Sequence, residues 1–183
     1  MHSLSPAIKT IAAKIKLVVF DVDGVLTDGT LTYSAVGEEV KHFNVKDGVG
    51  IKLLQTYGIH TAIISAKDSL PLQRRATDLG ITHFFPGSTD KWPVLAALLE
   101  ELGIQPNEVC YVGDDVIDLK VIKRVGLGVA PNDAFWMVKE HSQLVTQASG
   151  GKGVAREVAD IILGSRMKLE DAYIKAMLPE FEK

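Results

Sequence analysis

Two aspartates follow directly on a short apolar run near the start of the chain. Residues 15–20 are rich in Leu, Val and Ile, a composition typical of a buried strand, and Asp21-Val22-Asp23-Gly24 comes next. In open α/β sheets, ligands bind beyond the carboxyl ends of the strands. Carboxylates buried there are costly unless a cation compensates them. The sequence therefore predicts an acidic, metal-holding site at the end of the first strand.

Further polar groups follow or neighbour later apolar runs in the same way. They are Ser65-Ala66-Lys67, then Lys91 at the start of a helical pattern, then Gly113-Asp114-Asp115 with Asp118. If the apolar runs are parallel strands, these groups lie at one edge of a sheet and can converge.

Phosphoryl transfer through an aspartyl-phosphate is the chemistry that these residue types suit. Asp21 can attack phosphorus, and a magnesium ion with Lys91 can offset the repulsion between the two anions. Asp21 and Asp114 offer the carboxylate oxygens that Mg²⁺ prefers. Asp23, on the same side of the chain as Asp21, can protonate the leaving oxygen and then deprotonate the attacking water. The phosphate oxygens have two further donors, the Ser65 hydroxyl and the Ala66 N–H.

Each of these groups has an ordinary structural explanation when taken alone. An Asp-x-Asp pair is often a turn or a cap, Ser65 suits a helix N-cap, Lys91 suits a solvated surface, and a Gly-Asp-Asp turn can cap a helix. Their order along the chain, with each group at a separate strand or helix end, favours an active site.

Helical and strand patterns alternate from residue 47 onward, which predicts an α/β fold with a doubly wound parallel sheet. Glycine follows the helical patterns in a way that suggests left-handed C-caps. These glycines are Gly58, Gly80, Gly103 and Gly126. The expected strands after the first are 59–65, 82–85, 109–112 and 127–130. The expected helices include 91–102, 154–163 and 169–178.

Two segments depart from this alternation. Residues 30–33 and 39–45 read as a β-hairpin inserted after the first strand, and a two-stranded hairpin needs something to pack on, such as another subunit. The second segment is the tail, 149–183, in which a glycine-rich stretch precedes two helices. We expect residues 1–183 to form one domain.

Composition excludes several classes of function. The net charge of −3 argues against nucleic-acid binding driven by phosphate contacts. No apolar stretch approaches the about 18 residues of a membrane span, and the start of the chain lacks a signal-peptide layout. The single cysteine, Cys110, cannot form an internal disulfide and suits a reducing compartment. We therefore expect a cytoplasmic protein with no membrane or nucleic-acid partner.

The combined motifs resemble the haloacid dehalogenase (HAD) superfamily of phosphatases. More narrowly, the chain resembles phosphatases of 3-deoxy-D-manno-octulosonate 8-phosphate (KDO 8-phosphate). The narrower likeness rests on the sequence at 27–29, on the hairpin, on Asn-Val-Lys-Asp-Gly at 44–48 and on Gly-Gly-Lys-Gly-Val-Ala-Arg-Glu at 150–157.

The resemblance implies a Rossmann-like fold without a separate cap domain, and hydrolysis of KDO 8-phosphate in lipopolysaccharide biosynthesis. It implies that Asp21 is the nucleophile and Asp23 the acid/base. It also implies that Mg²⁺ binds Asp21, Asp114 and the Asp23 carbonyl, while Asp115 and Asp118 orient metal-bound waters. The family forms tetramers in which the hairpin of one subunit shields the site of its neighbour, so a homotetramer is expected here.

The sugar acid substrate carries a carboxylate besides its phosphate, so basic residues suit the sugar end of the site. The residues expected there are Asn44, Val45, Lys46, Asp47, Gly48, Lys52, Lys67 and Arg75. Lys52 and Arg75 also suit a solvated helix face.

The chain departs from the family at Ser65-Ala66-Lys67, where Ser-Gly-Arg or Thr-Gly-Arg is usual. Alanine keeps its N–H, whereas lysine lacks the planar fork of arginine. The nearer alternative is a phosphatase of a nine-carbon sialic-type sugar acid 9-phosphate. Such phosphatases tend to be acidic at the position of Lys67, so the lysine favours the eight-carbon substrate. A phospho-accepting signalling module is the alternative of another class. It would have no use for the Asp-x-Asp-Gly motif, the hairpin or the glycine-rich tail.

Overall fold

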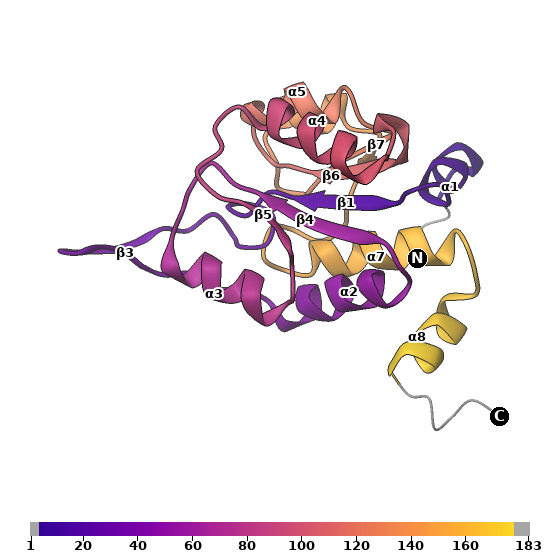
Figure 1. Ribbon diagram of the computed structural model, residues 1–183, viewed down its shortest axis with the longest axis horizontal. Helices are drawn as coiled ribbons and strands as arrows, with labels where there is room; N and C mark the ends of the chain where they lie inside the picture. Colours follow the sequence, from indigo (N-terminus) through magenta and orange to yellow (C-terminus); the bar gives the residue numbers. More distant parts are fainter. Residues whose placement is uncertain (1–3, 178–183) are drawn as a thin grey trace.

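The computed structural model describes residues 4–177 and is built on one six-stranded parallel sheet (Figure 1). The strands run in the order β5-β4-β1-β6-β7-β8, with β1 in the interior. Their bounds are β1 Leu17–Phe20, β4 His60–Ile64, β5 His83–Phe85, β6 Val109–Val112, β7 Leu127–Ala130 and β8 Leu144–Val145. The predicted doubly wound parallel sheet is confirmed, and β6 and β7 have the predicted bounds.

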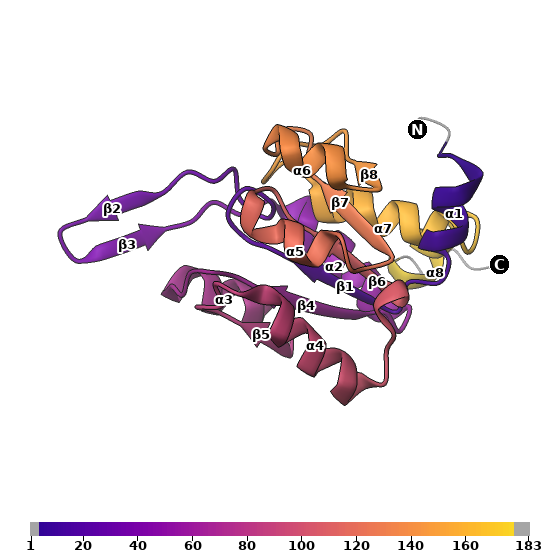
Figure 2. The ribbon, with the colours of Figure 1, turned by 90° about the horizontal axis from the view of Figure 1, so that it is seen from above.

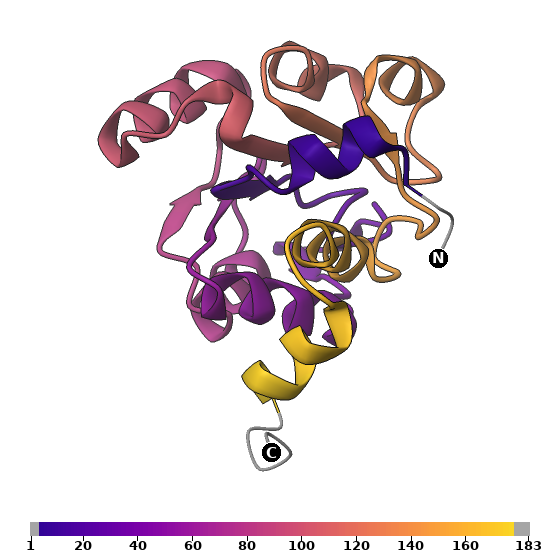
Figure 3. The ribbon, with the colours of Figure 1, turned by 90° about the vertical axis from the view of Figure 1, so that its right-hand side faces the viewer.

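Helices cover both faces of the sheet and enclose two buried apolar clusters (Figures 1 and 3). One face carries α1 Pro6–Ala12, α2 Val45–Thr56, α3 Leu70–Asp78 and α7 Val154–Gly164. The other carries α4 Lys91–Leu102, α5 Leu119–Ile122 and α6 Trp136–His141. Short 3₁₀ helices, η1 Pro106–Glu108 and η2 Val116–Asp118, flank β6. The carboxyl ends of all six strands therefore meet at one edge, between two helical layers.

The predicted hairpin is present, but with shifted strands. They are β2 Thr32–Ser34 and β3 Gly37–Val40, so the prediction of a strand over 39–45 is wrong for most of its length. Val45 instead begins α2, because the Asn44 side chain accepts a hydrogen bond from the Lys46 N–H and caps the helix. The hairpin projects away from the sheet and its helices (Figure 2).

One of the four predicted glycine C-caps is also wrong. Gly58, Gly80 and Gly103 have φ values of 70°, 64° and 64°, as the left-handed conformation requires. Gly126 is not among the glycines of positive φ. A Cβ at Gly126 would lie 2.2 Å from the Asn107 carbonyl oxygen, so a close approach of two backbones explains this glycine.

The tail after β8 turns back across the sheet before its last helix. Its glycine-rich turn leads into α7, which packs beside α2, and α8 Leu169–Met177 follows. Figure 3 shows α8 standing outside the two helical layers. The predicted end of this last helix, residue 178, lies outside the described residues. Within residues 4–177, no helix combines the length and apolar character needed to cross a membrane.

Candidate active site

Asp21 is the first residue beyond β1 and lies on the sheet edge where the carboxyl ends of the strands meet. Its N–H continues the ladder by donating to the Val112 carbonyl, 2.9 Å away. Its side chain is buried and lies 2.9 Å from the Lys91 Nζ. Burial raises the pKa of Asp21 to about 7, the Asp118 carboxylate acts in the same direction, and Lys91 opposes both.

Lys91 begins α4 and points inward under the sheet edge, with only 1% of its surface exposed. Its Nζ lies between two carboxylates, at 2.9 Å from Asp21 and 2.7 Å from Asp118. Burial alone would lower its pKa, but the two carboxylates raise it above the ordinary value. Lys91 is therefore a charged lysine in the interior, and the surface alternative for it is excluded.

Asp118 is fully buried, and both of its oxygens are occupied by protein donors. Oδ1 accepts from the Lys91 Nζ at 2.7 Å and from the Tyr111 hydroxyl at 2.6 Å. Oδ2 accepts from the N–H groups of Asp114 at 3.1 Å and Asp115 at 3.3 Å. This set of bonds holds Lys91 against the sheet edge and fixes the turn that carries Asp114. It leaves Asp118 little capacity to orient metal-bound water, the role that the resemblance implies.

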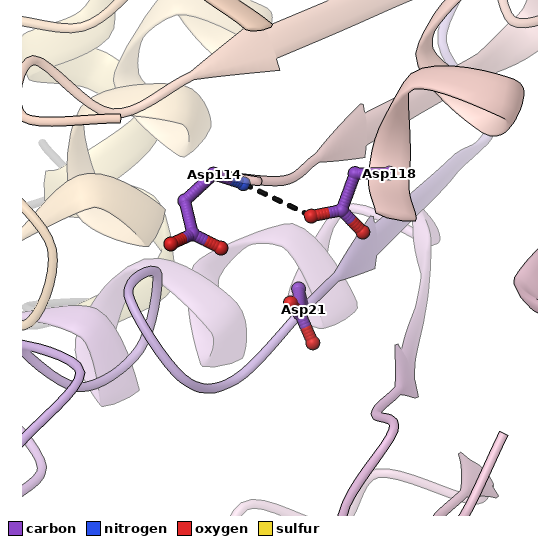
Figure 4. A group of neighbouring side chains, drawn as sticks. All are labelled: Asp21, Asp114 and Asp118. Carbon is purple, nitrogen blue, oxygen red and sulfur yellow. Dashed lines mark hydrogen bonds between the residues drawn. The ribbon is translucent and has the colours of Figure 1, made fainter. Parts of the chain in front are cut away.

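Asp21, Asp114 and Asp118 converge from two different strand ends (Figure 4). One carboxylate oxygen from each can be chosen so that all three lie within 4.8 Å of one another. Asp114 has its pKa raised to about 7 by burial and by the neighbouring carboxylates of Asp21 and Asp118. This crowding of acidic oxygens fits a magnesium ion, which would offset their repulsion. Because Asp118 is already bonded, Asp21 and Asp114 are the carboxylates that can serve as direct ligands.

A pocket of about 250 Å³ opens above these carboxylates. Its lining includes three of the predicted groups, those that begin at Asp21, Ser65 and Gly113, together with residues close to them in the sequence. The lining residues are Asp21, Asp23, Gly24, Gly29, Ser65, Ala66, Lys67, Asp114, Asp115 and Ile117. Ser65 is buried, and its hydroxyl accepts from the Lys67 N–H at 3.2 Å. The exposed Asp115 uses its carboxylate to cap η2, accepting from the Val116 N–H at 2.7 Å. The predicted convergence of strand ends is thus present.

Lys41 is a site residue that sequence reasoning missed. It follows β3, and its Nζ lies 2.5 Å from Oδ1 of Asp23. On the same side, the Lys67 Nζ donates to the Tyr33 hydroxyl of β2 at 3.3 Å. Both contacts join the hairpin to the pocket. No motif in the sequence marks Lys41, because its partner lies 18 positions earlier and only the folded chain brings the two together.

Most residues predicted for the sugar end lie outside this pocket. Asn44 caps α2 and also donates to the Gly151 carbonyl at 3.1 Å, and Arg75 donates to the Asn44 carbonyl at 3.0 Å. Asp47 is buried and accepts from the Ala155 N–H at 2.7 Å, and Gly48 leaves room for the Arg75 guanidinium, which a Cβ would meet at 2.8 Å. These residues join α2 to its neighbours.

The other predicted sugar contacts are no nearer to the pocket. Val45 is exposed at the start of α2, and Lys46 lines a separate cavity of about 350 Å³ beside α7. Lys52 lies close to Gly80, which precedes β5 and so belongs to the opposite edge of the sheet. Lys67 is the one predicted sugar contact that a single chain brings to the pocket.

Comparison with known proteins agrees with this geometry. The family model of haloacid dehalogenase-like hydrolases matches residues 61–158. A 3-deoxy-D-manno-octulosonate 8-phosphate phosphatase of Salmonella typhimurium is 43% identical over 169 residues, covering 92% of this chain and 90% of the relative.

Two solved structures are similar over nearly the whole fold. The Moraxella catarrhalis phosphatase of the same name, in complex with magnesium, phosphate and KDO, has a TM-score of 0.88, 39% identity, and coverage of 92% of this chain and 96% of that one. The cobalt-bound form of a deoxy-D-mannose-octulosonate 8-phosphate phosphatase from Haemophilus influenzae has a TM-score of 0.87, 39% identity, and coverage of 94% of this chain and 99% of that one. The chain therefore belongs to the haloacid dehalogenase-like hydrolases, within the family of 3-deoxy-D-manno-octulosonate 8-phosphate phosphatases.

Proposed function

We propose that this protein is a magnesium-dependent phosphatase that hydrolyses KDO 8-phosphate to KDO and phosphate, a step of lipopolysaccharide biosynthesis. The observation that carries the proposal is the buried Asp21, held 2.9 Å from Lys91 at the floor of the pocket that Asp114 also lines. Family membership supports the same reaction class and the same substrate. The relatives reported above are phosphatases, which favours hydrolysis over the alternative of a phospho-accepting signalling module.

Asp21 is the proposed nucleophile. Its carboxylate attacks phosphorus and gives an aspartyl-phosphate, while the sugar hydroxyl leaves. Lys91 favours the ionised form of Asp21 and places a positive charge beside the incoming phosphate. Mg²⁺, held by Asp21, Asp114 and the Asp23 carbonyl, would supply the rest of the charge compensation that two reacting anions need. Ser65 and the Ala66 N–H bind the phosphate oxygens.

Asp23 is the proposed general acid and base. It lines the pocket two residues after Asp21, so it can protonate the leaving oxygen and then take a proton from the water that attacks the aspartyl-phosphate. Lys41 lies against Asp23 at 2.5 Å and fixes the orientation of its carboxylate. Because Lys41 follows β3, the hairpin helps to position the proton-transfer group.

The working form is proposed to be a homotetramer in which hairpins shield neighbouring sites. The hairpin and its flanks expose large apolar side chains, Leu31, Tyr33, Val36 and Val40, at 39%, 63%, 84% and 41% of their surface. A second copy that covers them would enclose the mouth of the pocket and could bring the remaining basic residues to the sugar. We place the enzyme in the cytoplasm, where the buried thiol of Cys110 stays reduced.

A phosphate-release assay tests the function. Wild-type protein should release phosphate from KDO 8-phosphate with Mg²⁺ and lose this activity in excess chelator. It should prefer KDO 8-phosphate to a nine-carbon sugar acid 9-phosphate by kcat/KM. Asp21→Asn should fold normally but lose turnover by at least about 10³-fold, since the nucleophile is gone. Wild-type rates in Asp21→Asn would exclude the aspartyl-phosphate route.

A further inference from the structure

The loop after β7 and the glycine-rich turn before α7 both contact the backbone beside the proposed metal ligands Asp21 and Asp114. We define the glycine turn as Gly150 and Gly151, and the β7 loop as residues 131–135. The Gly150 N–H donates to Oδ1 of Asp133, 2.8 Å away. In the same β7 loop, the Phe135 N–H donates to the backbone carbonyl of Asp114, 2.9 Å away. One loop therefore holds both the glycine turn and the chain of Asp114.

The glycine turn also packs against the backbone of Gly24 and Val25, the two residues that follow Asp23. A Cβ at Gly150 would lie 2.3 Å from the Gly24 carbonyl oxygen, and the Gly151 N–H donates to the Val25 carbonyl at 2.9 Å. A Cβ added at Gly24 itself would lie 2.0 Å from Oδ2 of Asp114. Gly24 is thus packed between the glycine turn and the Asp114 carboxylate.

These contacts close a ring. It runs from the Asp114 carboxylate to Gly24, to the glycine turn, to Asp133, to Phe135 and back to the Asp114 backbone. We infer that Asp133 is a positioning residue for the magnesium site: through the glycine turn it fixes the backbone at Asp23 and Gly24 relative to the carboxylate of Asp114. The side chain of Asp133 lines none of the pocket around Asp21, so its effect is exerted through the turn.

The inference rests on the proposed function for its choice of metal, so its test measures binding directly. Titration calorimetry of metal-free protein with Mg²⁺ gives the dissociation constant without any turnover. Asp133→Ala should weaken Mg²⁺ binding about 10-fold or more, the effect usual for residues that orient metal ligands. Asp133→Asn keeps an oxygen acceptor for the Gly150 N–H and should stay within about threefold of wild type. Asn132→Ala, an exposed neighbour in the same loop, is the matched control.

Gly150→Ala tests the same ring from its other side. The added methyl group must push Gly24 away, so Mg²⁺ binding should weaken by about 10–100-fold. Gly164→Ala, where a Cβ meets nothing closer than 3.9 Å, is the control. For the Asp133 variants, the melting temperature without metal should match that of Asn132→Ala.

Two results would overturn the inference. One is equal Mg²⁺ affinity in Asp133→Ala and Asn132→Ala. The other is a loss of affinity in Asp133→Ala that Asp133→Asn fails to restore. The proposed function fails separately, if wild-type protein binds Mg²⁺ but does not hydrolyse KDO 8-phosphate.

Discussion

Lys91 carries a full positive charge at a place where 99% of its surface is covered. The carboxylates of Asp21 and Asp118 lie against this charge and neutralise it. Asp118 in turn accepts hydrogen bonds from the Tyr111 hydroxyl and from two backbone N–H groups. Buried ion pairs are tolerated only when the remaining hydrogen-bonding capacity is also filled. The nucleophile therefore depends on groups that never meet the substrate, and the effect of each can be measured by substitution.

Tyr111→Phe should lower kcat by about tenfold with little change in KM. Its hydroxyl is one of two donors to Asp118 Oδ1, so its loss lets Lys91 shift away from Asp21. Stability should fall by about 1.5–3 kcal/mol, as for other hydrogen bonds to charged groups. Tyr173→Phe is the matched control, because the Tyr173 hydroxyl also donates to an aspartate, Asp160, and neither residue lines the pocket around Asp21. Equal kcat losses in both variants would contradict the role of Tyr111.

The metal-free protein should lose stability as the pH rises from about 4 to about 7. Asp21 and Asp114 have pKa values raised from 3.8 to about 7, so the folded state binds more protons than the unfolded state across this range. The stability that these protonated carboxyls contribute is complete below pH 4 and is lost as they ionise near pH 7. Mg²⁺ needs the ionised forms, so its stabilising effect should be largest above pH 7 and small at pH 5.

Asp114→Asn should separate the cost of ionised carboxylates in the metal-free protein from the stabilisation by Mg²⁺ at pH 8. Without metal it should melt about 2–4 °C above wild type, the shift that about 1 kcal/mol gives in a domain of this size, because one buried charge is gone. It should also lose the rise in melting temperature that Mg²⁺ gives. Differential scanning fluorimetry with and without Mg²⁺ measures both, and Asp78→Asn, at an exposed aspartate that ends α3, serves as control. A metal-free Asp114→Asn that melts below wild type would contradict the repulsion argued here.

At the scale of elements, the contact between α2 and α7 fixes how the tail returns to the sheet. Asp47 in the first turn of α2 accepts from the Ala155 N–H at the start of α7, where a carboxylate is favoured. A Cβ at Gly50 would lie 2.6 Å from the Cα of Arg156. The two helices therefore approach closely because Gly50 has no side chain.

Gly50→Ala should destabilise the protein by about 1–3 kcal/mol, the usual cost of overpacking a close contact. Urea unfolding measures the change, with Gly164→Ala as a control that should be neutral or slightly stabilising. Activity at a temperature well below the transition should be nearly unchanged, since neither residue lines the pocket. A Gly50→Ala protein as stable as wild type would show that the helices separate without cost.

The sequence predicts the strand ends better than the contacts between them. Lys91 and Asp114 could be placed at the site because periodicity and chain order put them at the sheet edge, and a parallel sheet brings such ends together. Tyr111 and Lys41 could not, because their roles depend on partners set by side-chain direction. The hairpin bounds were misplaced for a similar reason: the apolar pattern up to Val45 suits a strand, and the cap formed by Asn44 starts a helix instead.

At the scale of the whole molecule, the hairpin meets the rest of the chain near the pocket and leaves its tip exposed. It projects beyond the sheet (Figure 2), and its tip residue Val36 is 84% exposed. If the hairpin packs over the site of a neighbouring subunit in the proposed tetramer, a charge at its tip must be buried in the assembly and will oppose assembly.

Val36→Asp should shift the protein from tetramer toward monomer, as measured by sedimentation velocity. The melting temperature at low protein concentration should be nearly unchanged, because Val36 belongs to neither buried cluster. Met167→Asp, at a partly exposed apolar residue before α8, is the control and should leave the mass as in wild type. A wild-type mass that is monomeric, or that Val36→Asp leaves unaltered, would contradict assembly through the hairpin.

The separation of the hairpin from the folded core has an evolutionary consequence. Among the described residues, none of the side chains in the two buried clusters comes from β2 or β3. Mutations there can accumulate at little cost in folding free energy, whereas the catalytic groups are locked into the sheet edge. Substitutions in β2 and β3 should therefore change the contacts that the hairpin makes with a sugar or a second subunit, while the catalytic groups at the sheet edge stay in place.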